Sequence, residues 1–234
     1  MRMSEAFQYP EQGIRLTVDA VVFGYRSDQL QVLLIRRKYA PFEGQWALPG
    51  GFVAEPESLE QAVERELSEE TGLKINYLEQ LFSFGEPRRD PRFRVVSIAY
   101  MAIIRSDNMP LQASTDATDA QWFDTQELPP LAFDHAQILE KAITRLRSKL
   151  RYQPIGFDLL PEKFLFSDLE RLYSTILNQP LDRRNFRKKM LSFGILEELS
   201  TKVSDGRGRP ASLYRFDLDR YQALQHENFY FEIP

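Results

Sequence analysis

The stretch that decides the fold of the first half of the chain is Gly51–Leu73, with the sequence GFVAEPESLEQAVERELSEETGL. Ser58, followed three residues later by Gln61, matches the capping box that begins many helices. Gly72 stands where a residue in the left-handed conformation would end the helix. Between these ends, apolar residues recur at helical spacing at Leu59, Ala62, Val63 and Leu67. The stretch therefore predicts a loop, a helix of about four turns and a second loop.

Glu66, Glu69 and Glu70 stand at positions i, i+3 and i+4 of this helix, so their carboxylates share one face. A solvated acidic face is the ordinary explanation of such a run. The alternative is a site for a hard divalent cation, because Mg²⁺ prefers carboxylate oxygens together with substrate phosphates. The residues that flank the three acids, and their spacing, favour the cation site.

The fixed positions of the stretch resemble the Nudix box, and all are filled: Gly51, Glu57, Arg65-Glu66-Leu67, Glu69-Glu70 and Gly72-Leu73. The resemblance implies hydrolysis of a diphosphate linked to another moiety, with Mg²⁺ or Mn²⁺ held by Glu66, Glu69 and Glu70. Glu69, Glu66 and Arg65 are then the expected catalytic residues. Arg65 either orients the carboxylates through paired hydrogen bonds or forms an ordinary surface ion pair. Glu57 either binds metal or fixes the loop.

Contacts to a ligand are expected from the box and from residues around it. Glycine at two successive positions would let the backbone approach a phosphate. The loop at 86–94, EPRRDPRFR, is basic, which is common on plain surfaces but here suits an anionic ligand. The expected ligand-binding residues are Arg37, Gly50, Gly51, Glu57, Arg88 and Arg92. His135 begins a helix, where a capping or surface role competes with catalysis.

The composition is that of an ordinary soluble protein, with 43% hydrophobic and 27% charged residues among 234. No apolar run is long enough to span a membrane, and the first residues lack the apolar core of a signal peptide. We therefore expect a cytoplasmic protein. The absence of cysteine fits that compartment and excludes disulfides, Cys–zinc sites and thiol catalysis.

Alternating and β-branched runs predict strands over residues 14–24, 30–38, 75–85, 95–104 and 119–123. Asp134 should cap a long helix over 135–150 with one apolar stripe. Mixed strands with two helices predict an α/β/α sandwich. Proline and glycine then interrupt the periodicity at Pro154, Gly156 and Pro161, so we expect one domain over 1–150 and another over 151–234.

The second domain reads as a winged helix, which makes the whole chain α+β. Ser167 should begin a helix with an inward stripe at Leu169, Leu172, Tyr173 and Ile176. After a short turn, Asp182 should cap a second helix that faces inward with Phe186, Met190 and Leu191 and stops at Gly194. Two short helices across a short turn make a helix-turn-helix. Two strand-like stretches flanking SDGRGRPA (204–211) add a hairpin with a basic tip.

Charge is concentrated in this second domain. The net charge is −4, yet residues 182–215 carry nine basic and four acidic side chains, which leaves −9 elsewhere. A solvated basic face is the plain explanation, but a basic helix beside a basic hairpin favours DNA. Arg183, Arg184 and Asn185 are the expected contacts to base edges. Arg187, Lys188 and Lys189 should hold phosphates, and Arg207 and Arg209 should reach the minor groove or phosphates.

The combination of motifs resembles a narrower family. The stretches GQWALPGGFV (44–53), DPRFRVVSIAY (90–100), LAFDHAQIL (131–139), LDRRNFRKKMLSFGILE (181–197) and GRGRPASLYRF (206–216) are similar to Nudix-related transcriptional regulators of NAD metabolism. The resemblance covers nearly the whole chain. It implies that ADP-ribose is an effector of the Nudix domain, and that a homodimer binds operator DNA of NAD-biosynthesis genes until ADP-ribose releases it.

Three functions stay open from the sequence. The first is a repressor whose Nudix domain senses ADP-ribose or a relative. The second is a metal-dependent ADP-ribose pyrophosphatase whose winged helix serves dimerisation or another partner. The third combines both, so that the regulator consumes its own effector. The intact box is in tension with a purely sensory role, because a protein that only senses its ligand can lose box residues.

Overall fold

The first part of the chain folds around one mixed sheet. Its strands are β1 (Arg15–Arg26), β2 (Gln29–Arg37), β3 (Trp46–Ala47), β4 (Gly50–Phe52), β5 (Leu78–Phe84), β6 (Val95–Ile103) and β7 (Ala117–Asp124). The computed structural model describes residues 13–73, 78–104, 117–203, 210–227 and 231–233. The main path of the sheet is β3-β2-β1-β6-β5, with β4 on β1 and β7 on β2. Only β3 and β4 were not expected, because they lie in the stretch PFEGQWALPGGFV (41–53), whose proline and glycine residues predict a loop. This stretch is called the glycine loop.

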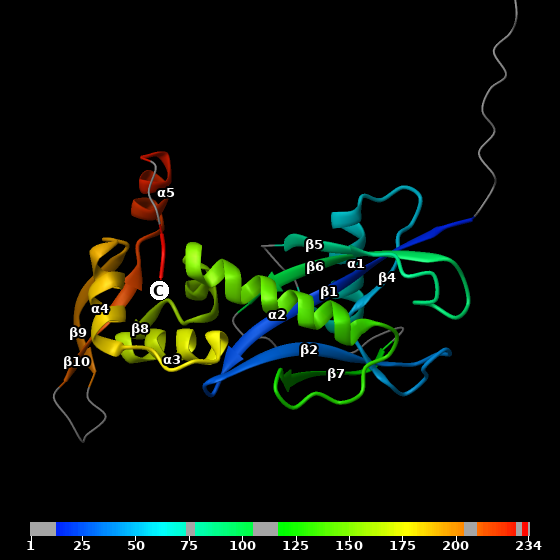
Figure 1. The fold of residues 1–234 in the computed structure, drawn as a ribbon, viewed down its shortest axis with the longest axis horizontal. Coiled ribbons are helices and arrows are strands. Elements are labelled where there is room, and N and C mark those ends of the chain that lie inside the picture. The colour runs from blue at the N-terminus through cyan, green and yellow to red at the C-terminus, as the bar shows by residue number, and fades with distance from the viewer. Residues whose placement is uncertain (1–12, 74–77, 105–116, 204–209, 228–230, 234) are drawn as a thin grey trace, which may run out of the picture.

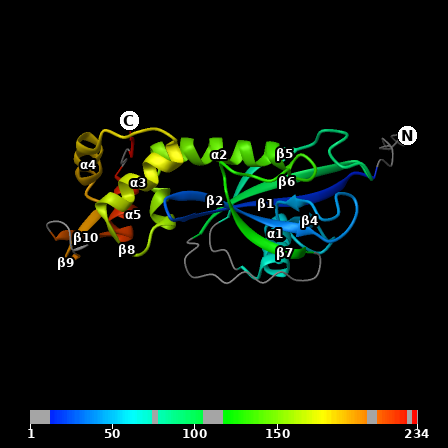
Figure 2. The same ribbon diagram turned by 90° about the horizontal axis from the view of Figure 1, so that it is seen from below.

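Two helices cover the two faces of this sheet, α1 (Leu59–Thr71) and α2 (His135–Tyr152). Figure 2 shows them on opposite sides. Alternate residues of β1 serve each side: Val18, Ala20 and Val22 pack in the cluster that contains α1, whereas Val21 and Phe23 pack in the cluster that contains α2. The expected α/β/α sandwich is confirmed. Asp19 is in phase with Val21 and Phe23 along the strand, so its side chain points to the face of the sheet that α2 covers.

The helix α1, which carries the residues that resemble the Nudix box, forms as its local sequence predicts. Ser58 Oγ accepts a hydrogen bond from the amide of Gln61 at 3.2 Å, and Gln61 Oε1 accepts one from the amide of Ser58 at 2.8 Å. Gly72 ends the helix with φ of 72°, which is the left-handed conformation. One acid of the helix, Glu70, is buried together with its apolar stripe. The helix therefore presents Glu70 to the protein interior and not to solvent.

The second part of the chain is a winged helix. It contains the short 3₁₀ helix η1 (Ile155–Leu159), β8 (Lys163–Leu165), α3 (Phe166–Leu177), α4 (Arg183–Ser192), β9 (Leu196–Val203), β10 (Ala211–Phe216) and α5 (Leu218–His226). The sheet order is β8-β10-β9. The inward stripe of α3 is buried as expected. Leu191, expected to face inward on α4, is 41% exposed, because it stands one residue, about 100° of helix rotation, beyond the buried Met190.

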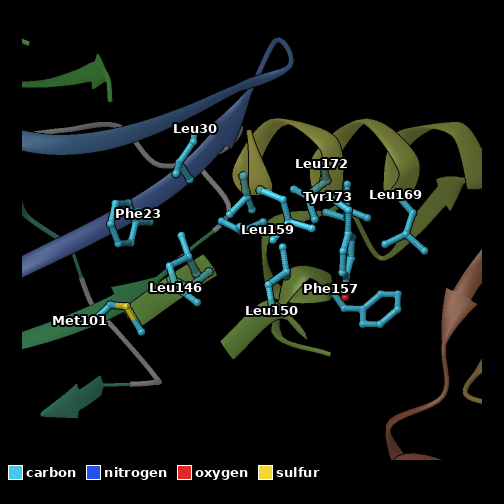
Figure 3. Close-up of a cluster of buried hydrophobic side chains, with 14 of the residues drawn as sticks. Phe23, Leu30, Met101, Leu146, Leu150, Phe157, Leu159, Leu169, Leu172 and Tyr173 are labelled. Atoms are coloured by element: carbon cyan, nitrogen blue, oxygen red, sulfur yellow. The ribbon is translucent and has the colours of Figure 1, made fainter. Parts of the chain in front are cut away.

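One hydrophobic cluster joins the two parts (Figure 3). It extends from Phe23 and Met101 of the large sheet, through Leu146 and Leu150 of α2, to Tyr173 of α3. In both ribbon views α2 runs along the large sheet toward the winged helix (Figure 1). Within the described ranges, no helix has the length and apolarity needed to cross a membrane.

Candidate functional site

A cavity of about 320 Å³ opens where the glycine loop, β1, the 86–94 loop and the start of α2 meet. Its walls carry both signs of charge and several aromatic rings. The polar and aromatic residues that line it are Thr17, Asp19, Arg37, Lys38, Tyr39, Phe52, Glu66, Glu70, Arg89, Asp90, Arg92, Phe133 and His135, and the backbone of Gly50 and Gly51 completes the wall. Its size is at the lower end of small-molecule sites.

The glycine loop is attached to both helices that flank the sheet. The amide of Gly50 donates to Glu70 Oε2 of α1 at 2.9 Å, and the amide of Leu48 donates to His135 Nδ1 of α2 at 2.9 Å. A Cβ at position 50 would lie 2.1 Å from the carbonyl oxygen of Val18, and the φ of 154° also requires glycine. A Cβ at position 51 would lie 2.2 Å from Glu66 Oε1. The two glycines therefore let the loop lie directly against β1 and against the box acid.

Arg65 holds the acids of the box in place. It donates to Glu57 from Nη2 at 2.7 Å and from Nε at 2.9 Å, and to Glu66 Oε1 from Nη1 at 2.8 Å. The hydrogen bonds from Arg65 lower the pKa of Glu57 to about 2. Glu57 also accepts from the amide of Ala54 at 2.6 Å, and it does not line the cavity. Of the two roles open to Glu57, the contacts favour fixing the loop over binding a ligand.

The structure divides the three acids expected to bind metal. Glu66 and Glu70 line the cavity, whereas Glu69 lies outside its lining with a side chain that is 49% exposed. In the described part of the chain, no three His, Asp or Glu side chains gather closely enough to hold a metal by themselves. Two carboxylates together with ligand phosphates and water still suit Mg²⁺ or Mn²⁺, whose preferred ligands are hard oxygens. The residues present therefore fit a cation that arrives with a phosphorylated ligand.

A buried charge network forms the opposite wall of the cavity. Arg89 donates to both oxygens of Asp134, at 2.9 and 2.7 Å, and to Asp19 Oδ2 at 3.1 Å. Ser97 Oγ donates to the same oxygen of Asp19. Burial opposes the charge of Arg89, but its bonds to Asp134 and Asp19 outweigh burial and raise its pKa. Asp134 was expected to cap α2, but its side chain makes no capping bond because Arg89 engages it.

His135 is part of this wall and not of the surface. The ring is 5% exposed, and its Nδ1 accepts from the amide of Leu48, so the proton of the neutral ring is on Nε2, 3.5 Å from Asp19 Oδ1. Burial lowers the pKa of His135 below its ordinary value. The expectation of a capping or surface histidine was wrong, because His135 lies on the same buried face of α2 as Ile138 and Leu139.

The expected ligand-binding arginines have different surroundings. Arg37 lines the cavity, its guanidinium donates to the carbonyl oxygens of Pro41 and Tyr39 and lies 4.8 Å from the centre of the Phe133 ring, and it forms no ion pair among the described residues. Arg92 also lines the cavity, but Asp90 binds its guanidinium at 2.8 and 3.1 Å. Arg88 is exposed and outside the lining, whereas its neighbour Arg89, which was not among the expected set, is inside. Of the three arginines expected to bind the ligand, Arg37 is therefore the best placed for a phosphate.

The second candidate site is the exposed face of α4. Asp182 accepts from the amides of Arg184 and Asn185, both at 3.1 Å, and so begins the helix as expected. Phe186 and Met190 are buried, which leaves the polar residues of the helix outside. The residues of α4 that were expected to contact DNA are all exposed: Arg183, Arg184, Asn185, Arg187, Lys188 and Lys189. The expected contacts Arg207 and Arg209 lie outside the described residues.

Arg187 differs from the other cations of α4. Its Nη2 donates to Tyr214 Oη at 2.8 Å, and its guanidinium lies 4.3 Å from the centre of the Phe166 ring. Tyr214 belongs to the wing strand β10 and Phe166 begins α3. Arg187 therefore ties the helix to the rest of the winged helix, in addition to any contact that it makes with phosphate.

Comparison with known proteins gives each part a match. Residues 14–145 match the model of the NUDIX domain, and residues 156–216 match the NrtR DNA-binding winged helix domain. The ADPR responsive transcriptional repressor NtrR of Acinetobacter baylyi is 37% identical over 210 residues, which cover 88% of this chain and 83% of the relative. The chain belongs to the NrtR family.

Solved structures agree with this family at the level of the whole fold. NrtR of Shewanella oneidensis in complex with a 27mer DNA is 34% identical, with a TM-score of 0.76 over 94% of this chain and 99% of that one. The NUDIX domain of the same NrtR, complexed with ADP ribose, is 41% identical, with a TM-score of 0.56 over 59% of this chain and 94% of that one. An ADP-ribose pyrophosphatase of Methanocaldococcus jannaschii is 46% identical over 110 residues, 47% of this chain and 64% of the relative.

Proposed function

We propose that this protein is a transcriptional repressor that binds operator DNA through α4 and the wing and senses ADP-ribose in the Nudix cavity. The observation that carries the proposal is that one hydrophobic core joins the part of the chain with an arginine-lined cavity to the part with an exposed basic helix. Similarity over 88% of the chain to the Acinetobacter repressor, over 94% to NrtR solved with DNA and over 59% to its NUDIX domain solved with ADP ribose supports it. Genes of NAD biosynthesis are the proposed targets.

The charges of the cavity suit the diphosphate of ADP-ribose. Arg37 can pair with a phosphate without giving up an acid partner, and Arg92 would have to share its guanidinium with Asp90. The acids Glu66 and Glu70 oppose a phosphate unless a cation lies between them. We therefore propose that Mg²⁺ or Mn²⁺ accompanies the ligand, held by Glu66 and Glu70 with Glu69 at the edge.

On the DNA side, a symmetrical operator requires two recognition helices, so a homodimer is the proposed form. Four cations of α4, Arg183, Arg184, Lys188 and Lys189, form no ion pair among the described residues and are exposed. These charges are available for phosphates, which supply most of the non-specific affinity for DNA. A regulator of transcription acts in the compartment that holds the DNA, which supports the cytoplasmic expectation.

A mobility shift of DNA from the genes adjacent to this one tests the proposal. The full-length protein should retard the fragment, and ADP-ribose should release it. The double variant Lys188→Ala and Lys189→Ala should lose the shift, and Arg88→Ala, on an exposed loop of the other part, should keep it. A protein that fails to bind these fragments at low salt would refute the repressor proposal.

Hydrolysis of ADP-ribose is the second proposed activity, because Arg65 still holds the box acids and the pyrophosphatase of Methanocaldococcus is similar over the Nudix part. When bound, the cation would neutralise the diphosphate and polarise its phosphorus. Incubation with ADP-ribose and Mg²⁺ should then release AMP and ribose 5-phosphate, and Glu66→Gln should abolish the release. Intact ADP-ribose after long incubation would refute the hydrolytic activity and leave sensing as the only proposed role of the cavity.

A further inference from the structure

The helix α2 touches the cavity at one end and the winged helix at the other. At its first residue, His135 lines the cavity and accepts from the amide of Leu48 at 2.9 Å, two residues before Gly50. Asp134, just before the helix, is held by Arg89 across the cavity wall. The start of α2 is therefore bonded to the glycine loop and to the 86–94 loop, which carries Arg89 and Arg92.

The other end of α2 is attached to the winged helix through two backbone groups. Arg147 Nε donates to the carbonyl oxygen of Ile176, in the last turn of α3, at 2.8 Å. The amide of Ile233 donates to the carbonyl oxygen of Arg151 at 2.9 Å. Phe231, in the same C-terminal segment, packs its ring at a tilt, 4.6 Å from that of Phe193, the residue that follows α4. Both attachments lead to the helix-turn-helix.

Between these ends, α2 is packed along its length against the hydrophobic core that joins the two parts of the chain. Its inward stripe, Ile138, Leu139, Ala142, Leu146 and Leu150, is at most 1% exposed, and it packs in the cluster that also contains Tyr173 and Phe186. Tyr173 of α3 in turn lies 5.1 Å, ring to ring, from Phe186 of α4. About three turns of helix separate His135 from Arg147, a rise of about 18 Å. Because its inward face is tightly packed along this length, we expect α2 to move as one unit when its first turn shifts.

We propose that α2 couples the cavity to the DNA-binding helix, with His135 as the positioning residue at the cavity and Arg147 as the positioning residue at the winged helix. The inference rests on the proposed function, because it assumes that ADP-ribose changes DNA affinity. A ligand that moves the glycine loop moves the acceptor of the Leu48 amide, and with it the start of α2. The Arg147–Ile176 hydrogen bond then sets the position of α3 and, through Tyr173 and Phe186, that of α4.

The test measures the coupling factor, the ratio of the DNA dissociation constants with saturating and without ADP-ribose, by fluorescence anisotropy of an operator duplex. In Arg147→Met, which keeps an unbranched apolar chain and loses the donor, the coupling factor should fall by about tenfold, the lower end of what one charge-assisted hydrogen bond contributes. Affinity for ADP-ribose alone, measured by calorimetry, should stay within about twofold. Arg145→Met is the matched control, since Arg145 is an exposed arginine on the same helix, and it should keep the wild-type factor.

The outcomes separate the two proposals. A wild-type coupling factor in Arg147→Met, with both ligands still bound, overturns the role of α2 and leaves the proposed function standing. A coupling factor of one in the wild-type protein overturns the sensing function and this inference together. Hydrogen exchange provides a second readout that a purely structural role would not change: ADP-ribose should alter exchange at the end of α3 in the wild-type protein and in Arg145→Met, but not in Arg147→Met.

Discussion

Arg89 donates to both carboxylate oxygens of Asp134, 45 residues further along the chain, at 2.9 and 2.7 Å. The side chains are 5% and 11% exposed, so the pair is held away from water. The bidentate geometry fixes the 86–94 loop against the start of α2, and Asp19 adds the central strand β1 to the same guanidinium. Arg89 therefore holds three segments together around the cavity: the 86–94 loop, the start of α2 and β1.

Arg89→Met should destabilise the protein, because it leaves Asp19 and Asp134 buried without their common partner. Removing one member of a buried ion pair costs roughly 3 kcal/mol or more. Urea unfolding at pH 7 measures the loss. Arg88→Met is the control, since Arg88 is exposed and lies outside the cavity, and it should change the free energy of unfolding by about 0.5 kcal/mol at most. Equal effects of the two substitutions would show that the buried network contributes nothing particular.

The stability should fall in mild acid through His135. Burial lowers its pKa in the folded state below the ordinary 6.5, so the unfolded chain takes up a proton that the folded chain does not. As the pH falls below about 6.5, the free energy of unfolding should therefore decrease by at most about 1.4 kcal/mol per pH unit from this group. His135→Gln should flatten the slope between pH 7.5 and 5.5. His226→Gln, which alters the other, exposed histidine, should retain the slope, and a retained slope in His135→Gln would contradict the assignment.

The two adjacent glycines should respond differently to alanine. At position 50 the added Cβ would lie 2.1 Å from the backbone oxygen of Val18, which cannot move without displacing β1, so Gly50→Ala should lower the melting temperature by many degrees. At position 51 the nearest atoms belong to the Glu66 carboxylate, the end of a flexible side chain. Gly51→Ala should fold, but it should bind ADP-ribose with Mg²⁺ at least about tenfold more weakly, as calorimetry would show. Normal binding of ADP-ribose by folded Gly51→Ala would show that Glu66 does not contribute to ligand binding.

Lys188 should act on DNA through its charge alone. It is exposed on α4 and forms no ion pair within the described residues. Lys188→Ala should weaken binding to operator and unrelated duplexes alike, and should lower the slope of log affinity against log salt by about 0.9. Binding to both duplexes over a range of KCl measures this slope. A loss restricted to the operator would instead assign Lys188 to base recognition.

Many structural features of this protein are determined by residues that lie close to one another in the sequence. The capping box of Ser58 and Gln61, the left-handed Gly72, the pairing of Arg65 with the box acids and the Asp182 cap of α4 all depend on neighbours within one or two turns. The exposed cations of α4 also follow from its period, because Phe186 and Met190 place the others outside. Such features are local, so the order of residues is enough to predict them.

Only the tertiary structure decided the composition of the cavity. In the run LTVDAVVFG (16–24), Asp19 is the one charged residue, and this alone could have indicated a buried partner, though not which one. The choice of Arg89 over Arg88, the burial of His135 and the exclusion of Glu69 from the lining depend on how loops separated by tens of residues meet across the sheet. Adjacent arginines have the same chemistry, and only packing against Asp19 and Asp134 makes one of them part of the site.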